Sequence, residues 1–334
     1  MSAVAEGRLL RRLIQAGARA EGDAFREVAA EVIQQERSKR HHLLANDLER
    51  ILYGEQSAQH GNLHPRPDVP KDAERGLPLL QFTLPRLSLR DLVLSEESRA
   101  PLAEVILEQE RRDVLASYGL RSASRLLFFG PPGCGKTTGA EVLATELGVQ
   151  LATVRLDAVV SSYLGETAAN LRKVFDFVEH ERLVVLFDEF DSVGKKREDP
   201  GDHGELKRVV NAFLQLVDAY RGPSVLIAAT NHERLLDRAL WRRFDEVVRF
   251  DKPTSEQIRL LLELKTRAIP SELQLSDSTL MNRFIGMSHA DIERVIVRAI
   301  KNMVLTGREV LSMDLVIESL RREDQRRLAL EVEN

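Results

Sequence analysis

Residues 130–138 have the composition and spacing of a loop that binds phosphate. They read Gly-Pro-Pro-Gly-Cys-Gly-Lys-Thr-Thr: four residues separate Gly130 from Gly135, and Lys136 and Thr137 directly follow Gly135. Glycines let backbone N–H groups turn toward a β-phosphate, and Lys136 adds a positive charge beside the β and γ oxygens. The hydroxyl of Thr137 is a ligand for Mg²⁺. The residues expected to bind nucleotide here are Gly130, Pro131, Pro132, Gly133, Cys134, Gly135, Lys136, Thr137 and Thr138.

Two adjacent carboxylates close an apolar run further along the chain. The sequence Leu-Val-Val-Leu-Phe at residues 183–187 is followed by Asp188 and Glu189. Asp188 can hold Mg²⁺ together with Thr137, while Glu189, one residue further on, can orient and deprotonate an attacking water. An acidic turn without chemistry is the weaker alternative, because phosphoryl transfer at a phosphate loop requires this second element.

Polar residues at two later positions could complete such a site. Asn231 follows an apolar run, and its carboxamide could position water beside a γ-phosphate. Arg242 and Arg243 precede another apolar run. Arginines in such places are usually surface salt-bridge residues, but their forked donors also suit the charge that develops on a γ-phosphate.

Buried strands and amphipathic helices must position these residues. A strand before the phosphate loop and a helix over 137–147 make an ordinary Gly/Pro turn the weaker interpretation. Residues 92–94 and a helix over 101–118 are expected to form the wall against which an adenine packs. The predicted strands are 126–129, 151–156, 183–188, 224–230 and 246–250. The fold class is therefore α/β: a parallel sheet of the P-loop type flanked by helices.

The chain divides into four parts by composition. Residues 1–53 read as an amphipathic helical module that binds a partner or substrate, and prolines mark 54–78 as a linker. We expect the α/β unit with the phosphate loop to cover 79–252, and a helical lid with a charged tail to cover 253–334. A basic cluster at 37–42 is either a solvated helix face or a surface for an acidic partner.

Composition excludes several classes of protein. The 334 residues are 43% apolar and 30% charged with a net charge of −4, which gives no overall attraction to nucleic acid or anionic lipid. The single cysteine, Cys134, allows no disulfide within the chain, so a reducing cytoplasm is the natural setting. No stretch approaches transmembrane length, and we expect no membrane association.

Four elements in this order and spacing resemble the AAA+ ATPases, and within them the classical AAA branch, whose members remodel proteins as hexameric rings. The elements are the phosphate loop, Asp188-Glu189, Thr230-Asn231 and Arg242-Arg243. The resemblance spans about residues 92–308 and is strongest to short stand-alone bacterial AAA ATPases. It implies ATP and Mg²⁺ as cofactors, ATP hydrolysis as the activity, and a homo-oligomer, most often a hexamer.

The same resemblance implies roles for residues outside the phosphate loop. Tyr163 and Leu164 match a central pore loop in which an aromatic and an aliphatic side chain grip an extended polypeptide. Arg242 and Arg243 match arginine fingers that reach into the site of a neighbouring subunit. His289 replaces the second glycine of a Gly-x-Ser-Gly-Ala-Asp segment that lies near the adenosine in this family.

We therefore expect an ATP-hydrolysing ring that pulls on or remodels a protein client through its pore loops. In this hypothesis the catalytic residues are Lys136, Glu189, Asn231, Arg242 and Arg243. Two alternatives share this core. One is a nucleotide-gated loader or switch that assembles on nucleic acid, which the net negative charge disfavours. The other is an ATPase that regulates a partner protease.

Overall fold

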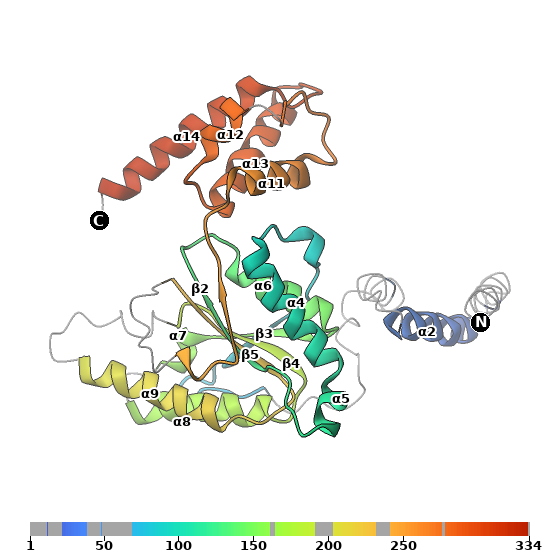
Figure 1. The fold of residues 1–334 in the computed structure, drawn as a ribbon, viewed down its shortest axis with the longest axis vertical. Coiled ribbons are helices and arrows are strands. Elements are labelled where there is room, and N and C mark those ends of the chain that lie inside the picture. Colours follow the sequence, from blue (N-terminus) through green and yellow to red (C-terminus); the bar gives the residue numbers. More distant parts are fainter. Residues whose placement is uncertain are drawn as a thin grey trace.

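A computed structural model describes most of the chain: residues 12, 22–38, 48, 69–160, 164–190, 203–231, 241–275 and 278–332. Within these ranges an α/β unit carries a separate group of C-terminal helices above one end of its sheet (Figure 1). The N-terminal helix α2 (Gly22–Ser38) buries Val28 and Ile33, in agreement with its amphipathic pattern. The side chains of the basic cluster at 37–42 lie outside the described residues.

The α/β unit is built on a six-stranded sheet in the order β1-β3-β4-β5-β2-β6. All neighbours pair in parallel except β1 and β3, which are antiparallel. Every residue of the two central strands β4 and β5 is buried, as expected for strands covered on both faces. The strands are β1 (Leu80–Thr83), β2 (Arg125–Phe129), β3 (Gln150–Val154), β4 (Leu183–Phe187), β5 (Val225–Thr230) and β6 (Glu246–Arg249).

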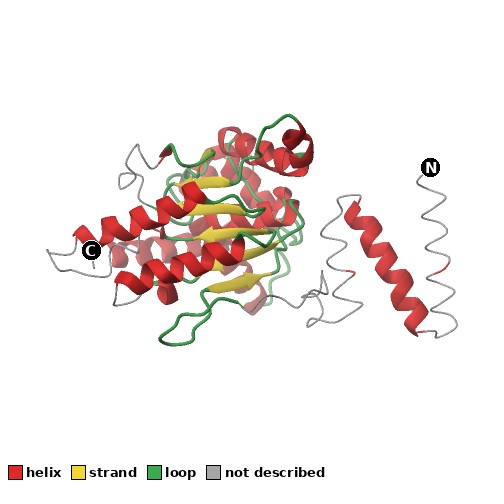
Figure 2. Ribbon diagram, turned by 90° about the horizontal axis from the view of Figure 1, so that it is seen from below, coloured by secondary structure: helices red, strands yellow, loops and turns green. Residues whose placement is uncertain are grey.

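Helices cover both faces of this sheet (Figure 2). Because side chains alternate along a strand, Leu126 and Phe128 pack beneath α4 and α6, whereas Leu127 packs in the core beneath α8 and α9. Phe187 of β4 lies in that second core, with its ring centroid 4.9 Å from the ring of Phe213. The helices of the unit are α4 (Glu96–Glu110), α5 (Arg112–Ser117), α6 (Lys136–Glu146), α7 (Leu156–Val159), α8 (Leu164–Val178) and α9 (His203–Ala219).

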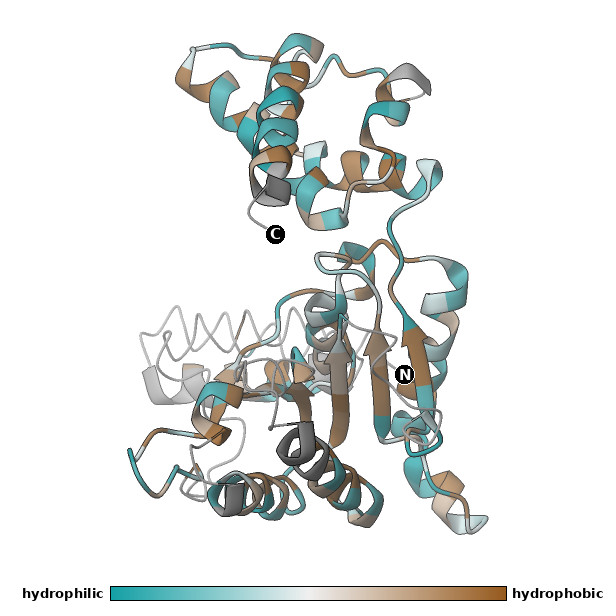
Figure 3. Ribbon diagram, turned by 90° about the vertical axis from the view of Figure 1, so that its left-hand side faces the viewer, coloured by the Kyte–Doolittle hydropathy of each residue, from teal (hydrophilic) through white to brown (hydrophobic). Residues whose placement is uncertain are grey.

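The C-terminal helices form a lid with its own core. They are α11 (Ser255–Thr266), α12 (Ser278–Phe284), α13 (His289–Leu305) and α14 (Met313–Val332). Their buried faces meet around Phe284, Ile296 and Val316, while the outer faces are hydrophilic (Figure 3). Val93 packs against this lid core and Leu94 against the sheet, so the segment that precedes α4 bridges the two units.

Two local expectations need correction. The helix expected to start at Pro101 starts at Glu96, where Ser95 caps it by accepting a hydrogen bond from the backbone N–H of Ser98. Pro101 lies inside this helix. The predicted linker, as far as residues 69–78 are described, is a turn packed on the sheet unit: Asp72 is buried and its Oδ1 accepts a hydrogen bond from Asn170 of α8 (3.3 Å).

Among the described residues, no helix is both long enough and apolar enough to cross a membrane. The α/β fold with a parallel sheet of the P-loop type and C-terminal helices is confirmed.

Candidate nucleotide site

Three neighbouring strands bring the predicted site residues to one edge of the sheet. Strands β4, β5 and β2 lie side by side, with Phe187 opposite Ala228 and Phe129 opposite Thr230. Their carboxyl ends lead into Asp188, Asn231 and Gly130 respectively. In parallel α/β sheets this edge is where ligands bind, so the phosphate loop, the two carboxylates and the carboxamide share one location.

The phosphate loop places Gly130, Gly133 and Gly135 at positive φ, a backbone conformation that favours glycine. Gly130 has φ 139°, and a Cβ there would lie 2.1 Å from the carbonyl oxygen of Phe250. Gly135 has φ 99° and caps the N-terminus of α6. A cradle of this kind presents backbone N–H groups and a helix N-terminus to phosphate, so the residues present fit a nucleotide.

Lys136 closes the loop on itself. Its Nζ donates hydrogen bonds to the carbonyl oxygens of Gly130 (2.8 Å) and Pro131 (2.9 Å), and its side chain is buried. Lys136 can transfer these hydrogen bonds to phosphate oxygens, which are stronger acceptors because they carry charge.

Thr137 and Asp188 meet at the position expected for Mg²⁺. The Thr137 hydroxyl donates a hydrogen bond of 2.7 Å to Oδ2 of Asp188. A hydroxyl and a carboxylate are the hard oxygen donors that Mg²⁺ takes when phosphate and water complete its shell. Among the described residues there is no cluster of three or more His, Cys, Asp or Glu side chains able to bind a metal. The Thr137 hydroxyl and the Asp188 carboxylate fit the ion by their chemistry.

Glu189 is exposed and occupies a strained backbone conformation. It is the one residue other than glycine with positive φ (48°) in the described ranges, and its N–H donates to Oδ1 of Asp188 (2.9 Å). Phe190 anchors the turn, because it is buried with its ring centroid 4.1 Å from that of Phe213. A residue other than glycine with this positive φ lies in the left-handed region, so the turn after β4 holds local strain at Glu189.

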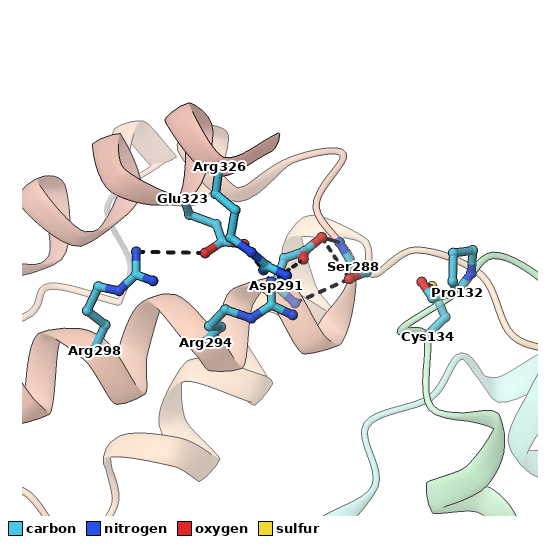
Figure 4. Close-up of polar contacts among 8 residues, drawn as sticks. All are labelled: Pro132, Cys134, Ser288, Asp291, Arg294, Arg298, Glu323 and Arg326. Atoms are coloured by element: carbon cyan, nitrogen blue, oxygen red, sulfur yellow. Dashed lines mark hydrogen bonds and ion pairs between the residues drawn. The ribbon is translucent and has the colours of Figure 1, made fainter. Parts of the chain in front are cut away.

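The lid reaches the phosphate loop through the first turn of α13. The N–H of Ala290 donates to the carbonyl oxygen of Gly133 (3.0 Å), and a Cβ on Gly133 would lie 2.8 Å from Oγ of Ser288. Ser288 and Asp291 form a capping box that starts α13. Figure 4 shows Ser288 opposite Pro132 and Cys134 of the loop.

Burial shifts the pKa of two side chains at this contact. It raises the pKa of the Cys134 thiol, although the nearby Lys136 charge acts the other way, so the thiol stays protonated. Burial also lowers the pKa of His289, partly offset by the backbone of Val93. Both ring nitrogens of His289 are buried, and neither meets the geometry of a hydrogen bond with any of the described residues.

Some predicted residues lie away from this cluster or beyond what is described. Arg242 is exposed on the turn before β6, and Arg243 is half-buried beside Asp218. Tyr163 lies outside the described residues, and Leu164 begins α8 with its side chain undescribed. The place of Ser288 and Ala290 at the phosphate loop is not among the features predicted from the sequence, although the Ser-x-x-Asp spacing at 288–291 indicates the start of a helix there.

Comparison with known proteins places the chain in a family. Residues 126–252 match the family described as ATPase family associated with various cellular activities (AAA). An uncharacterized AAA family ATPase of Sinorhizobium fredii is 40% identical over 332 residues, which are 98% of this chain and 99% of that protein. The chain belongs to the AAA family, which confirms the predicted ATPase activity.

Longer relatives match over part of their length. The ATP-dependent zinc metalloprotease FtsH 1 of Sphaerobacter thermophilus is 32% identical over 72% of this chain and 39% of its own length. A putative 26S proteasome regulatory subunit homolog of Methanocaldococcus jannaschii is 28% identical over 66% of this chain and 60% of its own. The chain therefore spans less than two thirds of these two relatives.

Proposed function

We propose that the chain is a protein-remodelling motor that hydrolyses ATP within an oligomeric ring and pulls on a protein client. The observation that carries the hydrolysis part of the proposal is the hydrogen bond between Thr137, which follows β2, and Asp188, which follows β4, with Glu189 exposed beside it. This arrangement combines phosphate binding, a place for Mg²⁺ and a free carboxylate.

Each residue has a distinct part in this reaction. Lys136 and the loop N–H groups hold the β- and γ-phosphates, and Thr137 with Asp188 would hold the ion. When bound, Mg²⁺ neutralises charge that develops on the phosphate oxygens. Glu189 accepts the proton of the attacking water, and Asn231 orients that water.

The substitution Glu189→Gln tests the catalytic assignment. It removes the base but keeps the size and the hydrogen bond of the backbone N–H. We expect ATP turnover to fall at least about a hundredfold, with ATP affinity within twofold of wild type. The matched control is Glu309→Gln, an exposed glutamate in the lid. Unchanged steady-state hydrolysis in Glu189→Gln would rule out this assignment.

We further propose that Tyr163 and Leu164 contact the client in the centre of the ring. Tyr163→Ala is expected to lose the stimulation of turnover by an unfolded protein such as casein, while basal turnover stays. Tyr118→Ala is the control, because Tyr118 is a tyrosine 80% exposed at the end of α5. Equal stimulation in both variants would contradict the pore-loop role.

A partner protease is a second candidate, and the names of the relatives favour it. One is a metalloprotease and another a regulatory subunit homolog of the proteasome. A pull-down with Glu189→Gln in ATP separates the two cases: a bound protease supports regulation of that enzyme, whereas varied bound proteins without a protease support independent remodelling.

A further inference from the structure

A carboxylate in the last helix is completely buried among arginines. Glu323 of α14 has no exposed surface, and its Oε1 accepts hydrogen bonds from Arg294 (2.5 Å) and Arg326 (3.0 Å). Arg298 lies 3.8 Å from its Oε2 (Figure 4). Arg294 and Arg298 belong to α13, so the cluster joins the two helices.

The cluster continues to the start of α13. The same Nη1 of Arg294 that reaches Glu323 also donates to Oδ1 of Asp291 (3.0 Å). Oδ2 of Asp291 in turn accepts a hydrogen bond of 2.8 Å from the Ser288 hydroxyl. A continuous path of charged and polar contacts thus runs from Glu323 to the residue that caps α13.

Ser288, the residue that caps α13, packs directly against Gly133 of the phosphate loop. The hydrogen bond between Ala290 and Gly133 and the 2.8 Å that would separate a Gly133 Cβ from Ser288 Oγ fix the distance between lid and loop. A change in the direction of the first turn of α13 therefore changes the loop contact directly.

Apolar side chains of α14 and α13 share one buried core. Leu315, Val316 and Leu320 of α14 are buried in the lid core. Ion pairs to a buried carboxylate add little net stability compared with apolar side chains, but they favour one geometry because a displaced arginine leaves the buried carboxylate unpaired. The arginine cluster around Glu323 therefore sets the orientation of the two helices more than their association.

We propose that Glu323 is a positioning residue for nucleotide binding: through Arg294 and Asp291 it sets the first turn of α13 against Gly133. The proposal rests on the assignment of the phosphate loop as the nucleotide site. In this proposal the affinity of the phosphate loop for nucleotide depends on the position of α14, although α14 belongs to the lid and the loop to the α/β unit.

Titration of the full-length chain with ADP and Mg²⁺ tests this. Glu323→Gln is expected to raise the dissociation constant of ADP about fivefold or more, the lower end of typical coupling between sites. KM for ATP should rise in parallel, with kcat changed less than twofold. Glu318→Gln is the control, because Glu318 lies on the same helix in an exposed pair with Arg322. It should bind ADP as the wild type does.

A second variant separates positioning from stability. Arg294→Lys keeps the positive charge but loses the planar guanidinium group that donates to both carboxylates. The variant should therefore fold with a melting temperature close to that of the wild type, but bind ADP more weakly. The double variant with both Glu323→Gln and Arg294→Lys should bind ADP no more weakly than the single variant that has the lower ADP affinity, because both residues act on one path. Wild-type ADP affinity in folded Glu323→Gln and Arg294→Lys, or additive losses in the double variant, would overturn the proposal.

Failure of the nucleotide site itself would look different. Lys136→Ala should abolish ADP binding if the phosphate loop is the site. If Lys136→Ala binds ADP normally, the site assignment is wrong. If Lys136→Ala fails to bind while Glu323→Gln binds like wild type, the site stands and the positioning role of Glu323 is wrong.

Discussion

Arg243 forms an ion pair with Asp218 of the same chain, with Nη1 and Oδ2 2.9 Å apart. Asp218 lies in the last turn of α9, so the pair ties that helix to the turn before β6. The adjacent Arg242 is exposed. The two arginines therefore differ: the Arg242 side chain is exposed to solvent, whereas Arg243 holds the turn that carries it.

We predict that Arg242→Ala reduces ATP turnover about a thousandfold, the lower range for a residue that stabilises the transferred phosphoryl group from another subunit. Its melting temperature should stay that of the wild type. Arg243→Ala should lower the free energy of unfolding by less than about 1 kcal/mol, since the pair is partly exposed. ATPase assays and thermal unfolding measure both effects.

Mixed rings test whether Arg242 acts on its neighbour. Arg242→Ala subunits keep their own base, and Glu189→Gln subunits keep their arginine, so a mixture should recover part of the turnover that each variant lacks. Arg112→Ala, which removes an arginine on α5 that pairs with its neighbour Asp113, is the control for loss of a surface charge. No recovery in the mixture would mean that Arg242 acts within its own chain.

The backbone of Glu189 predicts opposite effects on stability and activity. A residue other than glycine with φ 48° is strained by about 1 kcal/mol. Glu189→Gly should relieve this strain and raise the melting temperature while it abolishes turnover; Glu189→Gln should abolish turnover without the gain. Equal melting temperatures for the two variants, measured by calorimetry without nucleotide, would show that the turn is unstrained.

Local patterns were sufficient for the parts of the site that lie at strand ends. Strands β4 and β5 are apolar on both faces, so their sequences alone indicated buried parallel strands, and the polar residues after them had to lie at one edge. The glycine spacing of the phosphate loop likewise reflects a local backbone requirement. These features need no knowledge of distant contacts.

Features set by contacts between distant segments were not predictable in this way. Glu323 stands in the charged tail, where composition indicates solvent exposure, yet Arg294, 29 residues earlier, helps to bury it completely. The antiparallel strand β1 was also missed, because its four residues are too few to show a clear alternation. In both cases the tertiary partner, rather than the local sequence, decides the environment.

His289 predicts a loss of stability under mild acid. Because burial lowers its pKa in the folded chain, the unfolded chain binds the proton more readily. The contribution of His289 to the free energy of unfolding is therefore fully present above the unfolded pKa of about 6.5 and is lost as the pH falls toward the folded pKa. The total loss is about 1.4 kcal/mol for each pH unit by which folding lowers this pKa. Chemical unfolding at pH 7.5 and pH 5.5 (about one unit either side of that pKa) measures the change.

His289→Gln is the reference for this measurement, because glutamine does not titrate. The nearby Asp291 acts in a different range: its lowered pKa adds stability above its ordinary value of 3.8 that is lost only in stronger acid. The stability difference between wild type and variant should thus shrink between the two pH values. A stability difference independent of pH would mean that His289 has the same pKa in the folded and the unfolded chain.

Gly133 offers a direct test of the contact between lid and loop. Gly133 and Gly119 have nearly the same positive φ, 72° and 74°, but a Cβ on Gly119 meets nothing within 4 Å. Both Gly→Ala changes should lose about 1 kcal/mol of stability through backbone strain. Gly133→Ala alone should also displace Ser288, whose hydroxyl is held by Asp291, and weaken ADP binding about tenfold, a coupling of typical size. Equal ADP affinity in the two variants, measured by titration calorimetry, would show that nucleotide binding does not depend on this contact.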